Sequence, residues 1–518
     1  MRSGPHTMEN QNMHRHVNYA CLTAILAILF IAAPVVHAGS TIFVTTINQE
    51  INNDSFCSFQ EAIYAANLDD NKAPDIDNPG QFIATGCEAG NGADVIELPP
   101  GNVFSYADPI TDSDNFVGPA VTPIITSTLT IEGRGAKLDR VSGGRPTRAF
   151  VVGPTGFLDL REVHIQGFFI HGGNGGMRGG GGGMGAGGAI YVQGGRLLVQ
   201  WSTFEGNGVR GGNGGNDGVA VEGGGGGGGL SGNGGEGDFS GGGGGGSRGD
   251  GGDAHDLSLD YRGGGGGGRV TSGSDEAPGQ PCGGAGGESG FGYGVSGDSA
   301  SPFCPGGGGG GGSGTSDLSP GDGGSGSYGG GGGGGGGGGT LASGNGGDGG
   351  FGGGGGGASD NEGGDGNFGG GGGSGFEAFS VGHGQGGTFA GDGGTRTGGG
   401  GAGLGGAIFG YLADIDVVNS TFTENWAERG QSGITCGLDS CGPEANDGRG
   451  AGGAIFTVAG DLRVVNSTIA GNEAVTVTNG GAAASSSTTP SATMRRRSCF
   501  GTASSHITAH RSATPGTA

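Results

Sequence analysis

Apolar and polar residues alternate in short runs at four places along the chain. In three of them the run follows a Gly-Gly-Ala-Ile segment and ends in Phe-x-x-Asn or Ile-x-x-Asn. A period of two over a short run predicts a β-strand with one buried face. The three copies align without a gap over residues 187–207, 405–425 and 452–472. Their matching positions are Gly187, Gly405 and Gly452; Gly188, Gly406 and Gly453; Asn419 and Asn466; Phe204, Phe422 and Ile469; and Asn207, Asn425 and Asn472.

This repeat predicts a solenoid. A paired-glycine turn, a short strand, a second turn and another strand make one coil of a β-helix. One coil cannot bury its apolar face alone, so the coils must stack. The second and third copies start 47 residues apart, at Gly405 and Gly452, which predicts about two coils. Asn419 and Asn466 occupy equivalent positions, and their stacked amides are expected to form a hydrogen-bonded ladder that Trp201 interrupts in the first copy.

A fourth, less regular copy lies between residues 157 and 168. Its apolar residues Leu158, Leu160 and Ile165 match the alternating apolar positions of the later copies, but the Gly-Gly opening is missing. We therefore expect the first coils of the solenoid within residues 39–170, behind an N-terminal cap.

Residues 1–38 have the features of a secretory signal peptide. Arg2 and Arg15 supply positive charge, residues 20–33 form an apolar run, and Val36-His37-Ala38 is a small-residue cleavage site. The apolar run is short for a transmembrane helix, although an uncleaved membrane anchor remains the alternative. The mature chain is expected to start at Gly39 and to be secreted, with no membrane span after cleavage.

Three segments of the N-terminal part resemble a known domain. Ser58 with Glu61 three residues later predicts a capped helix within residues 57–67. This segment, residues 86–99 and residues 129–133 resemble the CSLREA domain, with Phe59-Gln60 in place of the usual Leu-Arg. That domain opens many bacterial secreted right-handed β-helix proteins. The Gly-Gly-Ala-Ile and Phe-x-x-Asn units also resemble repeats of bacterial polymorphic outer membrane proteins.

The resemblance implies an all-β, right-handed parallel β-helix at the bacterial cell surface or outside the cell. By this resemblance the N-terminal part is a cap that covers the exposed strand edges of the first coil. Cys57 and Cys87 suit an oxidising environment, and a disulfide between them would hold the capping helix to the following segment. Cys282 with Cys304, and Cys436 with Cys441, are candidates for local bridges in loops. A metal site is not expected from these cysteines, because no Cys-x-x-Cys pair occurs.

Residues 171–404 are dominated by glycine and contain one coil, at 187–207. A flexible insertion is the favoured interpretation, because glycine loses the most backbone entropy on ordering and has no side chain for a core. The alternative is a packed array of polyproline-II-like glycine helices, whose contact faces must lack side chains. Residues 405–480 are expected to form further coils. Residues 481–518, rich in Ser, Thr, Ala and Arg, are expected to be a disordered or aberrant tail.

Charge and composition narrow the function classes. The formal net charge of −25 argues against a nucleic-acid partner. Gly-x-Gly-x-x-Gly occurs within the glycine runs without a βαβ context, so no cofactor is expected. The repeats, the export signal and the resemblance favour a non-enzymatic, adhesin-like or surface-structural protein. Its partner would be an unknown extracellular ligand, such as a glycan or a component of a host or cell surface.

Two other functions stay open: a polysaccharide lyase or hydrolase, and a glycine-rich extracellular matrix component. The enzyme would need clustered carboxylates, or a carboxylate-bound calcium with a basic residue, on one exposed face. The pair formed by Asp414 and Asp416 does not recur in the other copies, which is typical of solvated residues on an outer face. We therefore assign no catalytic or metal-binding residue. The candidates for an enzyme are Asp159, Arg161, Glu162, His164, Asp414 and Asp416.

Overall fold

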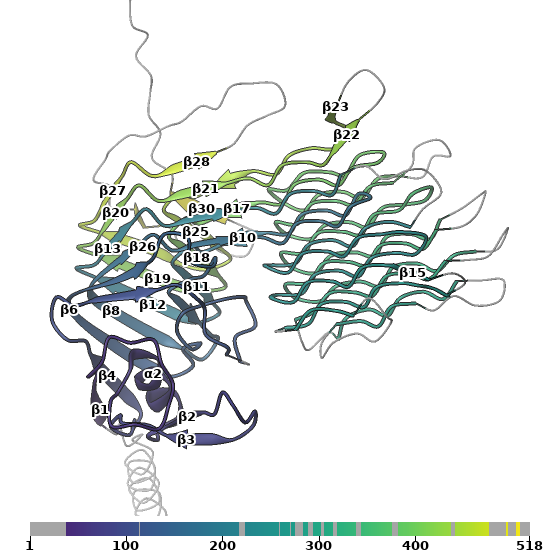
Figure 1. The fold of residues 1–518 in the computed structure, drawn as a ribbon. Helices are drawn as coiled ribbons and strands as arrows, with labels where there is room; N and C mark the ends of the chain where they lie inside the picture. Colours follow the sequence, from purple (N-terminus) through teal and green to yellow (C-terminus); the bar gives the residue numbers. More distant parts are fainter. Residues whose placement is uncertain are drawn as a thin grey trace, which may run out of the picture.

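The computed structural model describes residues 38–475, 494–495 and 504–507. Within the first range it leaves out 113, 217–222, 258–259, 270, 275–282, 288–293, 302–304, 314–318, 338–342, 376–381 and 437–440. The expected signal peptide, apart from Ala38, and most of the predicted tail lie outside the described residues. A stack of β-coils forms one side of the molecule, and rows of extended segments form the other (Figure 1).

The four sequence copies stack as parallel coils. Leu158, Leu197, Ile415 and Leu462 pair in register in one row across four strands. Phe204 and Phe422 pair in the same way, and their rings stack with centroids 4.7 Å apart. The period-two pattern therefore buries one face of every coil, as predicted, and the parallel β-helix is confirmed.

The coils align their strands into four sheets. The longest contains β1 (Ala38–Phe43), β4 (Ala93–Glu97), β5 (Val103–Tyr106), β6 (Thr128–Arg140), β8 (Phe157–Gln166), β12 (Arg196–Gln200), β13 (Thr203–Glu205), β19 (Asp414–Val418), β20 (Thr421–Thr423), β26 (Leu462–Val465), β27 (Thr468–Ala470) and β29 (Met494–Arg495). The second contains β7 (Phe150–Val152), β11 (Ile190–Gln193), β18 (Ile408–Tyr411), β25 (Ile455–Val458) and β30 (Ser504–Ile507). The third contains β9 (Phe169–His171), β14 (Gly208–Arg210), β21 (Trp426–Glu428) and β28 (Glu473–Val475), and the fourth β10 (Gly185–Ala186), β17 (Gly403–Leu404) and β24 (Gly450–Ala451).

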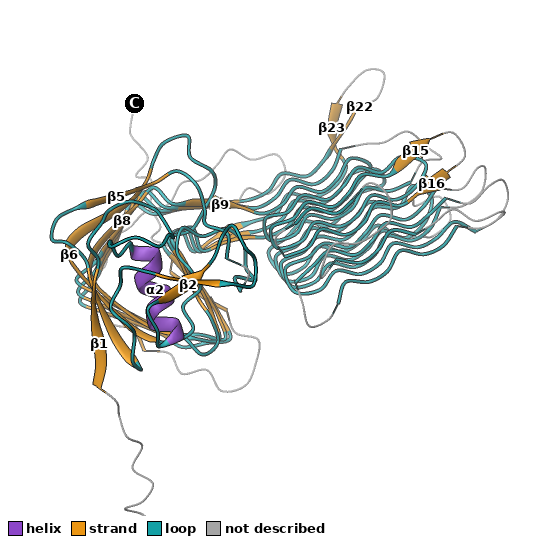
Figure 2. Ribbon diagram, turned by 60° about the horizontal axis from the view of Figure 1, so that its bottom comes forward, coloured by secondary structure: helices purple, strands orange, loops and turns teal. Residues whose placement is uncertain are grey.

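Consecutive copies are adjacent coils, so the prediction of about two coils per 47 residues is wrong. β18 pairs residue for residue with β11 on one side and β25 on the other. The additional residues leave the coil after β9, β14 and β21 and return before β10, β17 and β24. Residues 172–184, 211–402 and 429–449 are thus excursions from the same place in three successive coils. Together they form one body, which we call the glycine array (Figures 1 and 2).

Backbone hydrogen bonds show that the glycine array is a packed set of threefold helices. Between Gly352 and Ala358, every third N–H donates to the neighbouring segment 368–374. The N–H groups of Gly353 and Gly356 donate to a second neighbour, segment 347–350. Those of Gly354 and Gly357 donate to a third, segment 225–228. A period of three with no bonds inside the helix is the pattern of polyproline II. The flexible interpretation is therefore wrong for the described residues, and the packed alternative is correct.

The packing explains why these helices are made of glycine. A Cβ added to Gly353, Gly354 or Gly355 would lie 2.0, 2.2 or 1.9 Å from a backbone oxygen of three different neighbours. On the surface of the array every third residue carries a side chain instead. Asp348 is one of these, and its Oδ1 accepts a hydrogen bond of 2.9 Å from the N–H of Asp365 in the next helix. An unbroken glycine run thus marks an interior helix, and a Gly-Gly-x period marks a surface helix.

An apolar layer joins the glycine array to the solenoid. The strands β11, β18 and β25 are buried on both faces, as is usual for parallel strands covered on two sides. One face, with Ile190, Ile408 and Ile455, belongs to the solenoid core. The other face packs against aromatic turn residues of the array. This second cluster includes Tyr191, Phe409 and Phe456 from the strands and Tyr328, Phe351, Phe368 and Phe389 from the turns.

Arg148 lies buried where cap, coil and array meet. Its guanidinium donates to the carbonyl oxygens of Val117, at 3.1 Å, and Ala186, at 2.9 Å, and lies 5.4 Å from the ring centroid of Tyr191. Desolvation lowers the pKa of Arg148 to about 10, so the side chain stays charged at neutral pH. Tyr191 also shares a 2.7 Å hydrogen bond with Tyr328 of the array.

The cap begins with the predicted helix, α2 (Phe59–Leu68), which lies across the first coils (Figure 2). The capping box is present: the N–H of Glu61 donates to Ser58 Oγ, and the N–H of Ser58 donates to the Glu61 carboxylate. The disulfide Cys57–Cys87 is also present, as expected. A hairpin of β2 (Lys72–Pro74) and β3 (Phe82–Ala84) lies beside the helix.

Removing this disulfide is expected to destabilise the cap. Replacing both Cys57 and Cys87 by serine frees a loop of 30 residues in the unfolded chain, which costs roughly 3–4 kcal/mol by loop-closure entropy. We expect faster amide hydrogen exchange in α2 and β4, measured by mass spectrometry, with unchanged exchange in β18 and β25. Equal acceleration in all four elements would contradict a role confined to the cap.

A second disulfide is expected in the glycine array. The hairpin of β22 (Ile434–Cys436) and β23 (Cys441–Pro443) places Cys436 directly opposite Cys441 in the antiparallel register. Opposite residues of such a pair have Cα atoms about 4.5–5.5 Å apart, within the range of disulfides. Peptide mapping without reduction should recover the two cysteines as one linked peptide. Cys282 and Cys304, the other candidate pair, lie outside the described residues.

Candidate functional site

The outer face of the longest sheet holds the residues considered for catalysis. Asp159 and Asp416 both pair in register with Leu198, which lies on the strand between them. Two strand spacings separate them by roughly 9.6 Å along the sheet. The carboxylates are therefore on one face, as the alternating pattern required, but they are not adjacent.

Asp159 belongs to an ion-paired group. Arg161 donates from Nε and Nη2 to Asp159 Oδ2, at 3.0 and 2.5 Å, and from Nη1 to Glu132 Oε1 at 2.7 Å. Gln200 Nε2 donates to the other oxygen of Asp159 at 3.0 Å. The bonds to Asp159 raise the pKa of Arg161 above its usual value. Both oxygens of Asp159 are thus engaged by side chains of its own strand and the next coil.

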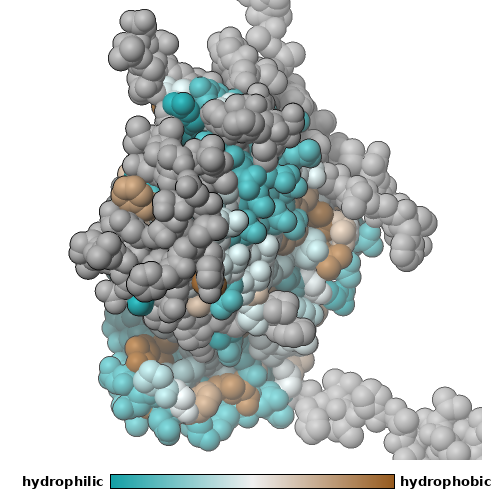
Figure 3. Space-filling model, turned by 90° about the vertical axis from the view of Figure 1, so that its right-hand side faces the viewer, coloured by the Kyte–Doolittle hydropathy of each residue, from teal (hydrophilic) through white to brown (hydrophobic). Residues whose placement is uncertain are grey.

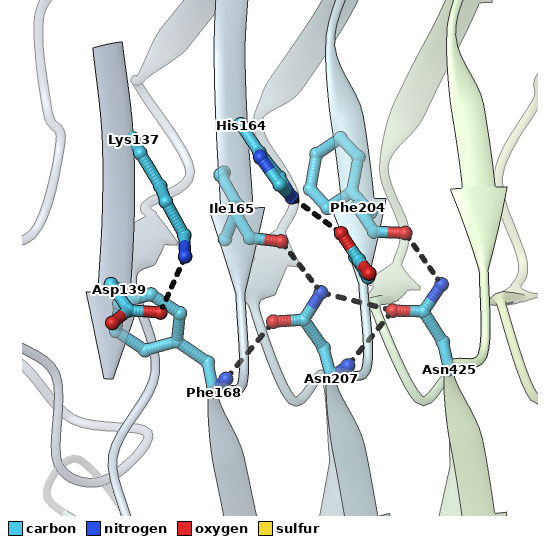
Figure 4. Close-up of polar contacts among 9 residues, drawn as sticks. Lys137, Asp139, His164, Ile165, Phe168, Phe204, Asn207 and Asn425 are labelled. Atoms are coloured by element: carbon cyan, nitrogen blue, oxygen red, sulfur yellow. Dashed lines mark hydrogen bonds and ion pairs between the residues drawn. The ribbon is translucent and has the colours of Figure 1, made fainter. Parts of the chain in front are cut away.

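The other candidates are similarly paired or separated. His164 Nε2 lies 2.9 Å from Glu205 Oε2, and Lys137 Nζ lies 3.2 Å from Asp139 (Figure 4). Asp416 lies 3.3 Å from Arg463, its register partner in the next coil.

Glu162 is exposed at a corner of the coil, with a left-handed backbone (φ 51°). Asp414 is exposed at the start of β19. The arrangement links neighbouring coils by ion pairs, and the structure does not bring the six candidates together around one point. Among the described residues, no group of three or more His, Cys, Asp or Glu side chains has the geometry of a metal site.

The amide ladder forms at a different position from the predicted one. Asn419 and Asn466 lie at exposed corners with φ of 51° and 50°, a left-handed conformation that asparagine tolerates better than most residues. The equivalent corner in the first copy is Trp201, with φ 49°. Asparagine recurs here because of the backbone conformation, so the prediction of a ladder at this corner is wrong.

The ladder runs instead through Asn207, Asn425 and Asn472, which are buried. Figure 4 shows its Asn207–Asn425 contact. Asn207 Nδ2 donates to Asn425 Oδ1 at 2.9 Å, and Asn425 Nδ2 donates to Asn472 Oδ1 at 2.8 Å. The recurrence of Phe-x-x-Asn was the sequence signal. The residue before each asparagine has a positive φ (Gly206 62°, Glu424 56°, Gly471 68°), which interrupts the alternation and turns the asparagine inward. A second row of hydrogen bonds accompanies it: the backbone N–H of Ser202 donates to Ser420 Oγ at 3.2 Å, and the N–H of Ser420 donates to Ser467 Oγ at 3.1 Å.

Comparison with known proteins adds no further assignment. No family model, no curated protein and no solved structure matches this chain. In the part of the chain that the structure describes, no helix has the length and apolar character needed to span a bilayer.

Proposed function

We propose that this protein is a secreted or cell-surface, non-enzymatic, adhesin-like protein that presents its glycine array to an extracellular partner. The observation that carries the proposal is the array itself, a packed body that projects from one side of three successive coils (Figure 1). Because its interior helices are built of glycine, side chains such as Asp348 and Asp365 lie on its surface, whereas the aromatic turn residues pack against the solenoid. Two hairpins, β15 (His255–Leu257) with β16 (Asp260–Arg262) and β22 with β23, stand out from its margin.

The disulfide and the resemblance of the N-terminal part support an extracellular setting. In the view onto the outer end of the array, the coloured residues include a hydrophilic group above the middle, with hydrophobic groups beside it and at the bottom (Figure 3). The disulfide Cys57–Cys87 agrees with an oxidising environment. The resemblance of the N-terminal part to the CSLREA domain of secreted bacterial β-helix proteins supports the same location. That resemblance also underlies our proposal of a right-handed helix with an adhesin-like role.

Binding to intact cells tests the proposal. Fluorescently labelled protein, starting at Gly39, would be added to bacterial and epithelial cells, with unlabelled protein as competitor and heat-unfolded protein as control. The same preparation would be incubated with neutral and acidic polysaccharides and assayed for chain cleavage. We expect saturable binding without cleavage. Cleavage that is lost in Asp159→Asn would overturn the proposal in favour of a polysaccharide-active enzyme. Neither binding nor cleavage would favour a structural matrix protein.

A further inference from the structure

Two aromatic rings meet on the outer surface of the third sheet, above a glycine. Phe169, Gly208 and Trp426 occupy one register row of β9, β14 and β21. The rings of Phe169 and Trp426 come from strands that are not neighbours, yet their centroids are 5.3 Å apart with planes inclined by 30°. A Cβ on Gly208 would lie 2.0 Å from the indole atom Cε2, so the indole lies directly over the Gly208 backbone.

These rings are not part of a core. The next residues along the three strands, Ile170, Val209 and Ala427, point to the opposite side and form a buried cluster. Phe169 and Trp426 stay partly exposed, and the row continues into the exposed Glu473 of the following coil. Two mutually inclined ring faces are thus left partly open to solvent, although burying them fully would have stabilised the fold.

Planar polar groups surround the aromatic pair. The next outward-facing row, two residues along the strands, holds His171, Arg210 and Glu428, and Arg210 Nη2 is 2.7 Å from a Glu428 oxygen. On the other side the Arg140 guanidinium lies 6.0 Å from the Phe169 ring centroid. The backbone carbonyls of residues 144 and 145 hold Arg140 there by hydrogen bonds. The surface therefore combines apolar ring faces in the centre with hydrogen-bonding groups at the edge.

We propose that this aromatic platform (Phe169, Gly208 and Trp426, edged by His171, Arg210 and Glu428) binds a sugar ring of an extracellular glycan. A pyranose presents a face of C–H groups that stacks on an aromatic ring, and its hydroxyls point outward, where a guanidinium and a carboxylate are suitable partners. A nucleic-acid base would also stack, but the net charge of −25 disfavours its phosphates. The proposal rests on the adhesin-like function and assigns it a ligand class and a site.

Tryptophan fluorescence gives a direct test, because the chain contains only two tryptophans. Trp201 is 54% exposed at a coil corner and lies outside the platform, so Trp201→Phe leaves Trp426 as the single indole reporter. Glycans that bind the wild-type protein on a glycan microarray would be titrated into this variant. We expect a shift in indole emission that saturates at the same concentration as binding.

Matched variants then locate the site. We expect Trp426→Ala to weaken glycan affinity about tenfold or more, whereas Trp201→Ala leaves it unchanged. Gly208→Ala keeps the indole but displaces it, so affinity should fall although the tryptophan remains. Glu428→Gln, which is conservative in shape, should weaken binding by a smaller factor. Circular dichroism would confirm that each variant is folded.

The outcomes separate this proposal from the proposed function. Unchanged glycan affinity in Trp426→Ala would overturn the proposal that the platform binds glycan. No emission change in Trp201→Phe at saturating glycan would do the same. Neither result would affect the adhesin-like function, which rests on binding to cells. If the wild-type protein bound cells but no glycan on a glycan microarray, the platform proposal alone would be overturned. A wild-type protein that binds neither cells nor glycans would overturn the adhesin-like function itself.

Discussion

Replacing Asn425 by alanine is expected to destabilise the solenoid by about 3–6 kcal/mol, because it breaks the centre of the buried amide ladder. Asn425 Oδ1 accepts from both the backbone N–H and the Nδ2 of Asn207. Its own Nδ2 donates to Phe204 O and to Asn472 Oδ1. The substitution removes these partners from the N–H of Asn207 and the carbonyl of Phe204, and an unsatisfied buried group costs roughly 1–3 kcal/mol. Asn207 Nδ2 and Asn472 Oδ1 each lose one bond but keep another, to Ile165 O and from the N–H of residue 425. Urea unfolding, followed by the loss of β-sheet circular dichroism, measures the effect.

The matched control is the asparagine three residues before Phe422. Asn419→Gly removes an exposed amide and keeps a residue that adopts the left-handed backbone without strain, so we expect a change within about 0.5 kcal/mol. The two variants remove the same side chain from the same coil. Equal destabilisation by both variants would show that the buried ladder at Asn425 contributes no more to the free energy of unfolding than the exposed amide of Asn419.

The second large effect is expected inside the glycine array. Gly355→Ala places a methyl group 1.9 Å from the carbonyl oxygen of Gly364, and both sides of this contact are backbone. No rotamer change relieves such a clash, so neighbouring helices must separate and lose hydrogen bonds. We expect a cost of about 3 kcal/mol or more, at or above the usual range for overpacking. Hydrogen exchange followed by mass spectrometry should show accelerated exchange in the array and unchanged exchange in the solenoid core.

Asp348→Ala is the control for this prediction. Asp348 is exposed at a Gly-Gly-x position of a surface helix, where its side chain accepts one hydrogen bond from the neighbouring helix. Losing one exposed hydrogen bond should cost less than about 1 kcal/mol. If Gly355→Ala exchanged no faster than Asp348→Ala, the array would not need side-chain-free contact faces.

The solenoid could be predicted from the alternation of apolar and polar residues along the chain. The alternation of Leu158, Leu160 and Ile165 placed the degenerate first copy correctly, because one buried face per strand imposes a period of two. The cap helix and its disulfide were predicted from Ser58, Glu61, Cys57 and Cys87. Of the candidate acidic residues, Asp159 and Asp416 lie on one face of the sheet, as the period of two predicts, whereas Glu162 lies at a coil corner and Asp159 is almost fully buried. The ion pairs of this face were not predicted, because Arg161 meets Glu132 only after coils have stacked.

The glycine array shows where local pattern is insufficient. A glycine run has the same local propensity whether it is flexible or packed, since it has no side chain whose burial could be recognised. What orders it here is contact with other glycine helices far away in sequence, as when Gly354 donates to Gly228. The aromatic platform also depends on register: Phe169 and Trp426 meet because the coil between theirs has Gly208, without a side chain, in the same row.

The sequence by itself determined the parallel β-helix, the cap with its disulfide and the positions of the repeats, because strand period, helix capping and cysteine placement act over a few residues. Only the tertiary structure decided that consecutive copies are adjacent coils, that their excursions combine into one array, and that the ladder runs through Asn425 and not Asn419. These features depend on which backbone groups of distant segments meet. A glycine run or a recurring asparagine marks a segment that can pair, but the folded arrangement decides which distant segment it pairs with.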